Sequence, residues 1–172
     1  MKRNIFFIAG PPFSGKSTIG VILARRLRIP FENLDDLIEK RAGMPVHEVF
    51  GSMGEEGFRQ IESMCLREIA ASTHTLVVAL GGGTLLLPEN LEMVVSTGVL
   101  VTLAPDTTEL LARFELSRGR PLVPDPEALA GLLKARREHY AGLPGRIDTR
   151  GKTPEEVVAV IVESSGFLPK PR

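Results

Sequence analysis

Apolar residues along the chain form two alternating patterns. Short continuous apolar runs, such as residues 5–9 and 75–80, have the length of buried strands. Between these runs, apolar side chains recur every three or four positions, which is typical of amphipathic helices. The pattern predicts strands at residues 5–9, 31–32, 75–80, 99–103 and 147–148, and helices at or around residues 18–28, 35–41, 45–50, 58–69, 88–97, 110–114, 129–133 and 154–163.

This alternation of strands and helices indicates an α/β fold. Parallel strands joined by helices form a sheet that is covered on both faces. Ligands of such sheets bind at the carboxyl ends of the strands. We therefore expect functional side chains in the loops at residues 10–17, 33–36, 81–84 and 104–106.

The loop after the first predicted strand fits a phosphate-binding motif. Gly10, Gly15, Lys16 and Ser17 match the pattern G-x-x-x-x-G-K-[ST], and a predicted helix follows. Glycines let backbone N–H groups wrap a phosphate, and the helix N-terminus adds the positive end of its dipole. The lysine can reach the β- and γ-phosphates, and the serine hydroxyl can ligate Mg²⁺. A simple glycine-rich turn is the alternative interpretation.

Composition narrows the class of protein. The 172 residues suffice for one domain with a core, and the formal net charge of +0 favours neither nucleic acid nor a membrane surface as partner. We expect no signal peptide and no transmembrane segment, because no apolar run is long enough. The single cysteine, Cys65, rules out an internal disulfide and suits the cytoplasm. The three histidines lack metal-ligand spacing, so a zinc site has little support.

Five further motifs can be read along the chain after the phosphate loop. Each pairs a charged or glycine-rich segment with the end or the start of a predicted element. They are the carboxylates of residues 31–39 after a strand, the arginine of residues 54–59 at a helix start, the three glycines of residues 81–83 at a strand end, the arginines of residues 118–122 in a Gly- and Pro-rich stretch, and Arg136 four positions before Tyr140.

In this order and spacing, the motifs make the chain resemble the shikimate kinases from about residue 5 to residue 161. The resemblance implies one kinase domain over residues 1–172 with a three-layer P-loop kinase fold. In that fold a five-stranded parallel sheet carries helices on both faces, a substrate-binding helical region near residues 33–61 and a lid near residues 113–125. We expect a frayed tail over residues 166–172, because Pro169 and Pro171 follow the last predicted helix.

The resemblance also implies an activity. Shikimate kinases transfer the γ-phosphate of ATP to the 3-hydroxyl of shikimate, giving shikimate 3-phosphate and ADP on the route to chorismate and the aromatic amino acids. ATP and Mg²⁺ are the implied cofactors, and shikimate is the implied partner. A cytoplasmic monomer is expected, with no nucleic-acid or membrane partner.

Roles for single residues follow from the motif matches. Asp35 corresponds to the family aspartate that takes the proton of the attacking hydroxyl, a role that a carboxylate can fill in phosphoryl transfer. Arg59 and Arg136 correspond to the arginines that hold the substrate carboxylate, since a guanidinium can form two hydrogen bonds to it. Apart from the resemblance, Asp35 would be a helix N-terminal acid and both arginines exposed helix charge. The implied catalytic residues are Lys16, Asp35 and Arg120; the substrate-binding residues are Asp35, Arg59, Gly82 and Arg136; the nucleotide-binding residues are Phe13, Ser14, Gly15, Lys16, Ser17, Thr18, Arg120 and Lys152; and the metal ligand is Ser17.

The chain departs from the family pattern in three places. Asn33 replaces the first residue of the usual Asp-x-Asp, Phe13 replaces a glycine of the phosphate loop, and Asn90-Leu91 replaces a common Asn-Arg pair. Asparagine can hydrogen-bond a metal-bound water but brings no charge. Two alternatives therefore stay open from the sequence: a related kinase for another small hydroxylated acceptor, such as gluconate or an antibiotic, and a nucleotide-binding protein that has lost catalysis.

Overall fold

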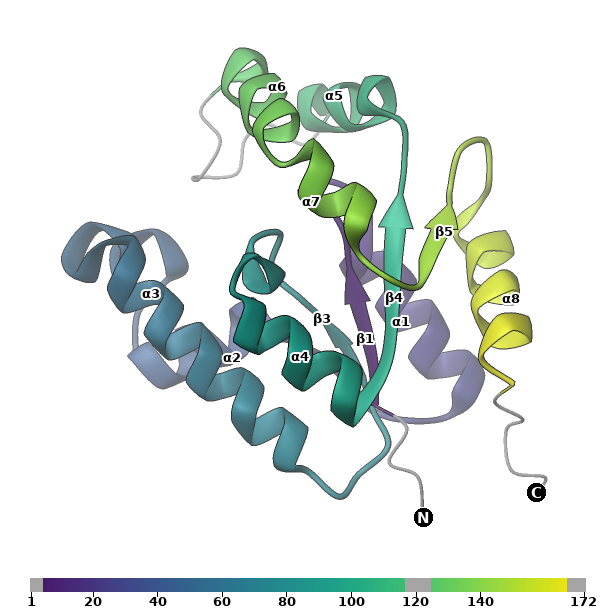
Figure 1. Cartoon of the computed structure of the whole chain (residues 1–172), viewed down its shortest axis with the longest axis horizontal. Coiled ribbons are helices and arrows are strands. Elements are labelled where there is room, and N and C mark those ends of the chain that lie inside the picture. The colour runs from purple at the N-terminus through teal and green to yellow at the C-terminus, as the bar shows by residue number, and fades with distance from the viewer. Residues whose placement is uncertain (1–4, 117–124, 167–172) are drawn as a thin grey trace.

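A parallel β-sheet forms the centre of the molecule (Figure 1). The computed structural model describes residues 5–116 and 125–166. Within these residues five strands run in the order β2-β3-β1-β4-β5, each parallel to its neighbours. This arrangement confirms the expected α/β fold with a five-stranded parallel sheet. The strands are β1 (Ile5–Ala9), β2 (Phe31–Asn33), β3 (Val77–Ala79), β4 (Gly98–Ala104) and β5 (Arg146–Asp148).

Helices cover both faces of the sheet (Figure 1). Side chains alternate along β1, so that Phe6 and Ile8 join one apolar core while Ile5 and Phe7 join the other. The helices are α1 (Lys16–Leu27), α2 (Leu34–Ala42), α3 (Val46–Ala71), α4 (Pro88–Thr97), α5 (Thr107–Leu116), α6 (Pro126–Ala135), α7 (Arg137–Gly142) and α8 (Pro154–Ser165), with a short 3₁₀ helix, η1 (Thr84–Leu86). The core that contains Phe6 and Ile8 includes α1 and α8, and the core that contains Ile5 and Phe7 includes α2, α3 and α4.

A third, smaller apolar cluster joins α5 to α6, which lie beside each other beyond the ends of β1 and β4 (Figure 1). Leu110 and Phe114 come from α5, and Leu129 and Leu133 come from α6. Phe13, from the loop after β1, packs against this cluster. We call these residues the α5–α6 cluster.

Most predicted elements are present, with shifts at their ends. The first helix begins at Lys16, two residues before its predicted start. The helices predicted at residues 45–50 and 58–69 belong to one element, α3, which is interrupted at Gly54 with φ 69° and ψ −176°. Neither η1 nor α7 was predicted, because η1 spans only three residues and α7 has no buried side chain and so no apolar stripe.

Some expectations fall on residues that the structure does not describe. Arg120 and most of the predicted lid at residues 113–125 lie outside the described residues, as does most of the predicted tail at residues 166–172. Along residues 5–116 and 125–166, no helix combines the length and the apolar character needed to cross a membrane.

Candidate active site

The phosphate motif lies at the carboxyl end of the central strand β1. Gly10, with φ 145°, and Gly15, with φ 89°, adopt backbone conformations that other residues rarely take. Gly15 is the N-cap of α1 and brings no side chain that could cap the first N–H groups of the helix. The Lys16 Nζ donates to the carbonyl oxygens of Gly10 at 3.1 Å and Pro11 at 2.8 Å. The loop thus places an ammonium group beside a helix N-terminus, a combination suited to phosphate.

A cavity of about 410 Å³ opens beside this loop, and we call it the nucleotide-side cavity. Arg113 of α5 lies at its edge and donates from Nη1 to the Phe13 carbonyl at 3.3 Å. Every predicted nucleotide-binding residue within the described ranges lines this cavity. These predicted residues are Phe13, Ser14, Gly15, Lys16, Ser17, Thr18 and Lys152. The cavity is also lined by residues that were not predicted: Ile19, Arg113, Thr149, Pro154 and Val157.

A second cavity, of about 430 Å³, lies on the other side of the loop, and we call it the acceptor-side cavity. It shares Phe13, Lys16 and Ser17 with the nucleotide-side cavity, so the two spaces meet at the phosphate loop. The predicted substrate-binding residues come from four separate segments of the chain, and all of them line this cavity: Asp35, Arg59, Gly82 and Arg136.

Asn33 connects Ser17 to Asp35. It is the last residue of β2 and the N-cap of α2, where its Oδ1 accepts a hydrogen bond from the Asp35 backbone N–H at 3.0 Å. Its Nδ2 donates to the Ser17 Oγ at 3.4 Å. Asparagine and aspartate serve about equally well as N-caps, so the departure from the family pattern keeps α2 capped. Asn33 thereby holds Asp35 in the first turn of α2, at the wall of the acceptor-side cavity.

A buried glutamate that the sequence interpretation missed holds Arg59 in place. Glu62 has 0% of its surface exposed, and its Oε2 accepts from the Arg59 Nη1 at 2.6 Å while its Oε1 accepts from the Thr84 Oγ1 at 2.6 Å. Burial raises the pKa of the Glu62 carboxyl, and the Arg59 guanidinium opposes that shift. The available signal was spacing, because Glu62 lies four residues from both Phe58 and Leu66, on the apolar stripe of α3.

The three glycines after β3 let other segments approach closely. A Cβ on Gly83 would overlap the Arg59 guanidinium, and a Cβ on Gly82 would lie 3.1 Å from the Pro12 ring. The Tyr140 Oη donates to the Gly82 carbonyl at 2.7 Å. Burial raises the pKa of the Tyr140 hydroxyl, so it stays protonated and donating at neutral pH. The glycine segment is therefore held between the phosphate loop, α3 and α7.

Two aromatic rings form an apolar wall of the acceptor-side cavity. Phe50 and Phe58 stack with ring centroids 4.3 Å apart and an interplanar angle of 28°. The Arg59 guanidinium carbon lies 5.2 Å from the centroid of the Phe58 ring. A ring face at this distance stabilises the cation and restricts where it points. Arg59 is thus fixed by a buried carboxylate on one side and by an aromatic ring on another.

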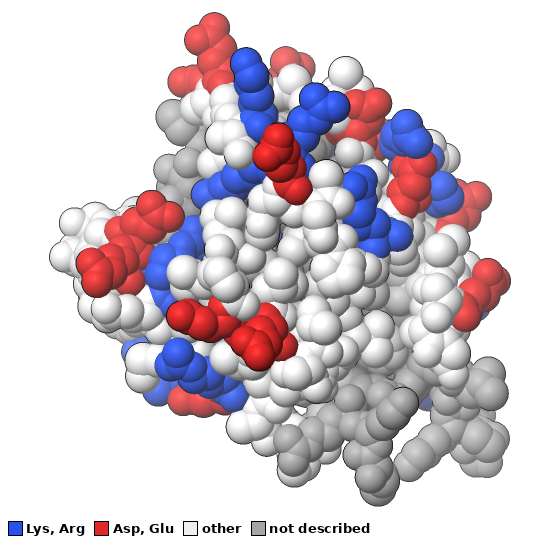
Figure 2. Space-filling model, in the orientation of Figure 1, with Lys and Arg blue, Asp and Glu red and all other residues white. Residues whose placement is uncertain are grey.

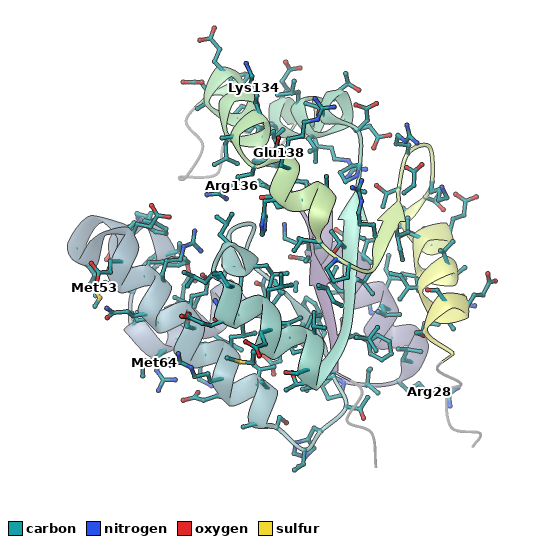
Figure 3. All side chains as sticks on the ribbon, viewed as in Figure 1. Arg28, Met53, Met64, Lys134, Arg136 and Glu138 are labelled. Atoms are coloured by element: carbon teal, nitrogen blue, oxygen red, sulfur yellow. The ribbon has the colours of Figure 1, made fainter. Side chains whose placement is uncertain are left out.

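Charges of both signs surround the site. Figure 2 shows basic and acidic side chains intermixed on one face of the molecule, in keeping with the formal net charge of +0. Figure 3 shows Arg136 extending from the junction of α6 and α7 toward the side that carries α3. Cys65 is buried. Among the residues that the structure describes, no three His, Cys, Asp or Glu side chains group as a metal site.

Comparisons with known proteins point in one direction. The family model described as shikimate kinase matches residues 12–165. A shikimate kinase of Geobacter sulfurreducens is 42% identical over 162 residues, which cover 92% of this chain and 88% of the relative. Among solved structures, shikimate kinase from Acinetobacter baumannii in complex with shikimate has a TM-score of 0.86 at 29% identity, covering 96% of this chain and 95% of that one. Shikimate kinase from Aquifex aeolicus has a TM-score of 0.81 at 32% identity, covering 94% of this chain and 96% of that one.

Proposed function

We propose how the residues of this chain, which belongs to the shikimate kinase family, divide the work of phosphorylating shikimate with ATP. Family membership makes the chain an ATP-using kinase with shikimate as its small-molecule substrate. It decides between the interpretations that the sequence left open, in favour of shikimate over other acceptors and of an enzyme over an inactive nucleotide-binding protein. What remains to be assigned is the role of each residue.

One observation carries the proposal: the two cavities meet at Lys16 and Ser17, and Asp35 lines the acceptor side of that meeting point. ATP placed in the nucleotide-side cavity brings its phosphates to the loop, with Lys16 beside the β- and γ-phosphates. Shikimate placed in the acceptor-side cavity brings a hydroxyl toward Asp35. The reacting atoms then face each other across the phosphate loop.

The chemical step moves one proton and one phosphoryl group. The 3-hydroxyl oxygen of shikimate forms a bond to the γ-phosphorus, and the bond from that phosphorus to the β–γ bridging oxygen breaks, releasing ADP. Asp35 accepts the proton of the attacking hydroxyl, and Lys16 stabilises charge on the phosphoryl oxygens. Arg120 is proposed to add a second positive charge to the phosphates, as the motif match implies.

Binding and orientation fall to the remaining residues. Arg59 and Arg136 hold the shikimate carboxylate from two sides of the acceptor-side cavity, and Gly82 lets the backbone come close to the ring. Lys152 lies where the adenine end of ATP would sit in the nucleotide-side cavity. These roles come from the motif matches, and the residues that line each cavity support them.

Mg²⁺ fits the donor set of this site. Mg²⁺ keeps several waters and usually binds one or two protein oxygens together with substrate phosphates. Ser17 offers such an oxygen where the two cavities meet, and Asn33 contacts it. When bound, the ion would neutralise phosphate charge.

We further propose that the protein is a cytoplasmic monomer of one domain and that it serves the route to chorismate.

The test compares two neighbouring carboxylates by the rate of ADP release with Mg²⁺ and ATP, in the presence and absence of shikimate. Asp35→Asn should lower shikimate-dependent kcat by at least about 10²-fold, the lower end for a lost general base. Asp36→Asn is the matched control, since Asp36 is exposed and lines neither cavity. Equal activity of the two variants would remove Asp35 from the chemical step.

A further inference from the structure

Phe13 combines an unfavourable backbone conformation with a packed side chain. Its φ of 64° lies in the left-handed region, which is costly for a bulky residue and free for glycine. Within the described residues, Arg28 is the other non-glycine residue with positive φ, and it caps the C-terminus of α1, where that conformation is common. Phe13 does not cap a helix, so its surroundings offset the cost of this backbone conformation.

That contact is with the α5–α6 cluster. The Phe13 ring meets the Phe114 ring edge to face, with centroids 5.3 Å apart and an interplanar angle of 88°. The Phe13 carbonyl also accepts from Arg113, the preceding residue of α5. Among the described members of the cluster, Phe13 alone comes from outside α5 and α6. It therefore attaches this pair of helices to the phosphate loop.

The attachment leads on to the acceptor side. Leu129 and Leu133 place α6 in the cluster, and the next turn of chain carries Arg136, the C-cap of α6 and N-cap of α7. Leu132 and Arg136 both line the acceptor-side cavity. Side chains packed into a cluster lock the helix that carries them. The contact of Phe13 with the cluster would therefore fix the position of α6, and with it the position of Arg136.

We propose that the Phe13 side chain is a positioning residue, which seats α5 and α6 on the phosphate loop and thereby aims Arg136 at the carboxylate of the acceptor. The inference rests on the proposed role of Arg136 and extends it to the residue that orients it. A glycine at position 13 would keep the loop shape and the carbonyl that accepts from Arg113, but it would lose the ring contact with Phe114.

The experiment is a double-variant cycle with Phe13→Gly, Phe114→Leu and both together, read as KM and kcat for shikimate and for ATP. Each single variant should raise the KM for shikimate about 2- to 12-fold, the range expected for one aromatic pair. In Phe114→Leu, kcat and the KM for ATP should stay within about twofold, since Phe114 lines neither cavity. Phe13 lines both cavities, so the readout that Phe13→Gly shares with Phe114→Leu is the rise in the KM for shikimate. Because both changes break the same contact, the double variant should rise no further than the larger single effect.

Two controls separate positioning from general destabilisation. Phe13→Leu keeps an apolar side chain on the cluster but loses the aromatic pair, so it should raise the KM for shikimate by less than Phe13→Gly does. Leu116→Ala changes an 85% exposed residue on the same helix and should leave both KM values unchanged. If Phe13→Gly does not fold, the comparison of Phe13→Leu with Phe114→Leu and their double variant gives the same test.

Three results would overturn the proposal. An unchanged KM for shikimate in Phe13→Gly would show that the attachment has no effect on the acceptor. Effects that multiply in the double variant would show that Phe13 acts without Phe114. If Arg136→Ala, measured alongside, left the KM for shikimate unchanged, both the proposed acceptor site and this inference would be wrong. If Arg136→Ala raised the KM for shikimate and Phe13→Gly did not, only this inference would be wrong.

Discussion

Replacing Arg136 with alanine tests the acceptor site directly, because the chain supplies its own control one residue away. Arg136 is half-buried and lines the acceptor-side cavity. Arg137 is exposed and lines neither cavity. Both residues sit at the junction of α6 and α7, so each alanine variant removes one positive charge from nearly the same place.

The expected magnitudes differ because the two charges differ in screening. A hydrogen bond to a charged group contributes about 1.5–3 kcal/mol, so losing the proposed bond from Arg136 should raise the KM for shikimate about 10- to 150-fold. Removing the exposed charge of Arg137 should change it by about twofold or less, and added salt should erase that change. The KM for ATP should change little in either variant, because neither arginine lines the nucleotide-side cavity.

Steady-state rates of ADP release, with shikimate and ATP varied in turn, give the KM for shikimate and the KM for ATP of each variant. Equal effects of Arg136→Ala and Arg137→Ala would show that only the net charge near the cavity matters, and the proposed carboxylate contact would be wrong. A raised KM for ATP with a fixed KM for shikimate would reverse the assignment of the two cavities. Direct titration of shikimate binding to each variant distinguishes lost affinity from a change in a later step.

Two further variants probe the phosphate side. Lys16→Ala should lower kcat about 10²–10³-fold with little change in melting temperature. The reason is that this partly exposed ammonium stabilises phosphate charge and contributes little to the core. Near-normal turnover would contradict the proposed placement of the phosphates. Asn33→Asp should lower the Mg²⁺ concentration needed for half-maximal rate, because the new carboxylate lies beside Ser17 and can still cap α2. Superimposable Mg²⁺ titrations of the variant and the parent would show that position 33 does not sense the metal.

The sequence predicted best what is local along the chain. The strand, loop and helix around Lys16 follow from an apolar run at residues 5–9 and the motif that directly follows it at residues 10–17. The structure shows these elements as expected, apart from the start of α1. The positions of Asp35, Arg59 and Arg136 around one cavity followed from the family resemblance, which carries three-dimensional information that periodicity lacks. The chemical roles of these residues stay predictions.

What the sequence did not predict depends on contacts between distant segments or on burial. The spacing puts Glu62 on the apolar stripe of α3, but its pairing with Arg59 and Thr84 beside the glycine segment depends on tertiary contacts. Likewise, the contact of Phe13 with Phe114 joins residues about a hundred positions apart, so no local pattern could indicate it. The break in α3 at Gly54 was expected only as a gap between two helices.

The two departures nearest the phosphates, Asn33 and Phe13, look alike in sequence but differ in physical consequence. Asn33 changes charge and keeps geometry, because its amide still caps α2 and still contacts Ser17. Phe13 keeps charge and adds a contact, because its ring ties the loop to α5 and α6 at the cost of a left-handed backbone. Their effects should therefore separate in kinetics: position 33 through the dependence of rate on Mg²⁺, and position 13 through the KM for shikimate. A variant of Phe13 that altered the Mg²⁺ dependence, with the KM for shikimate intact, would contradict this division.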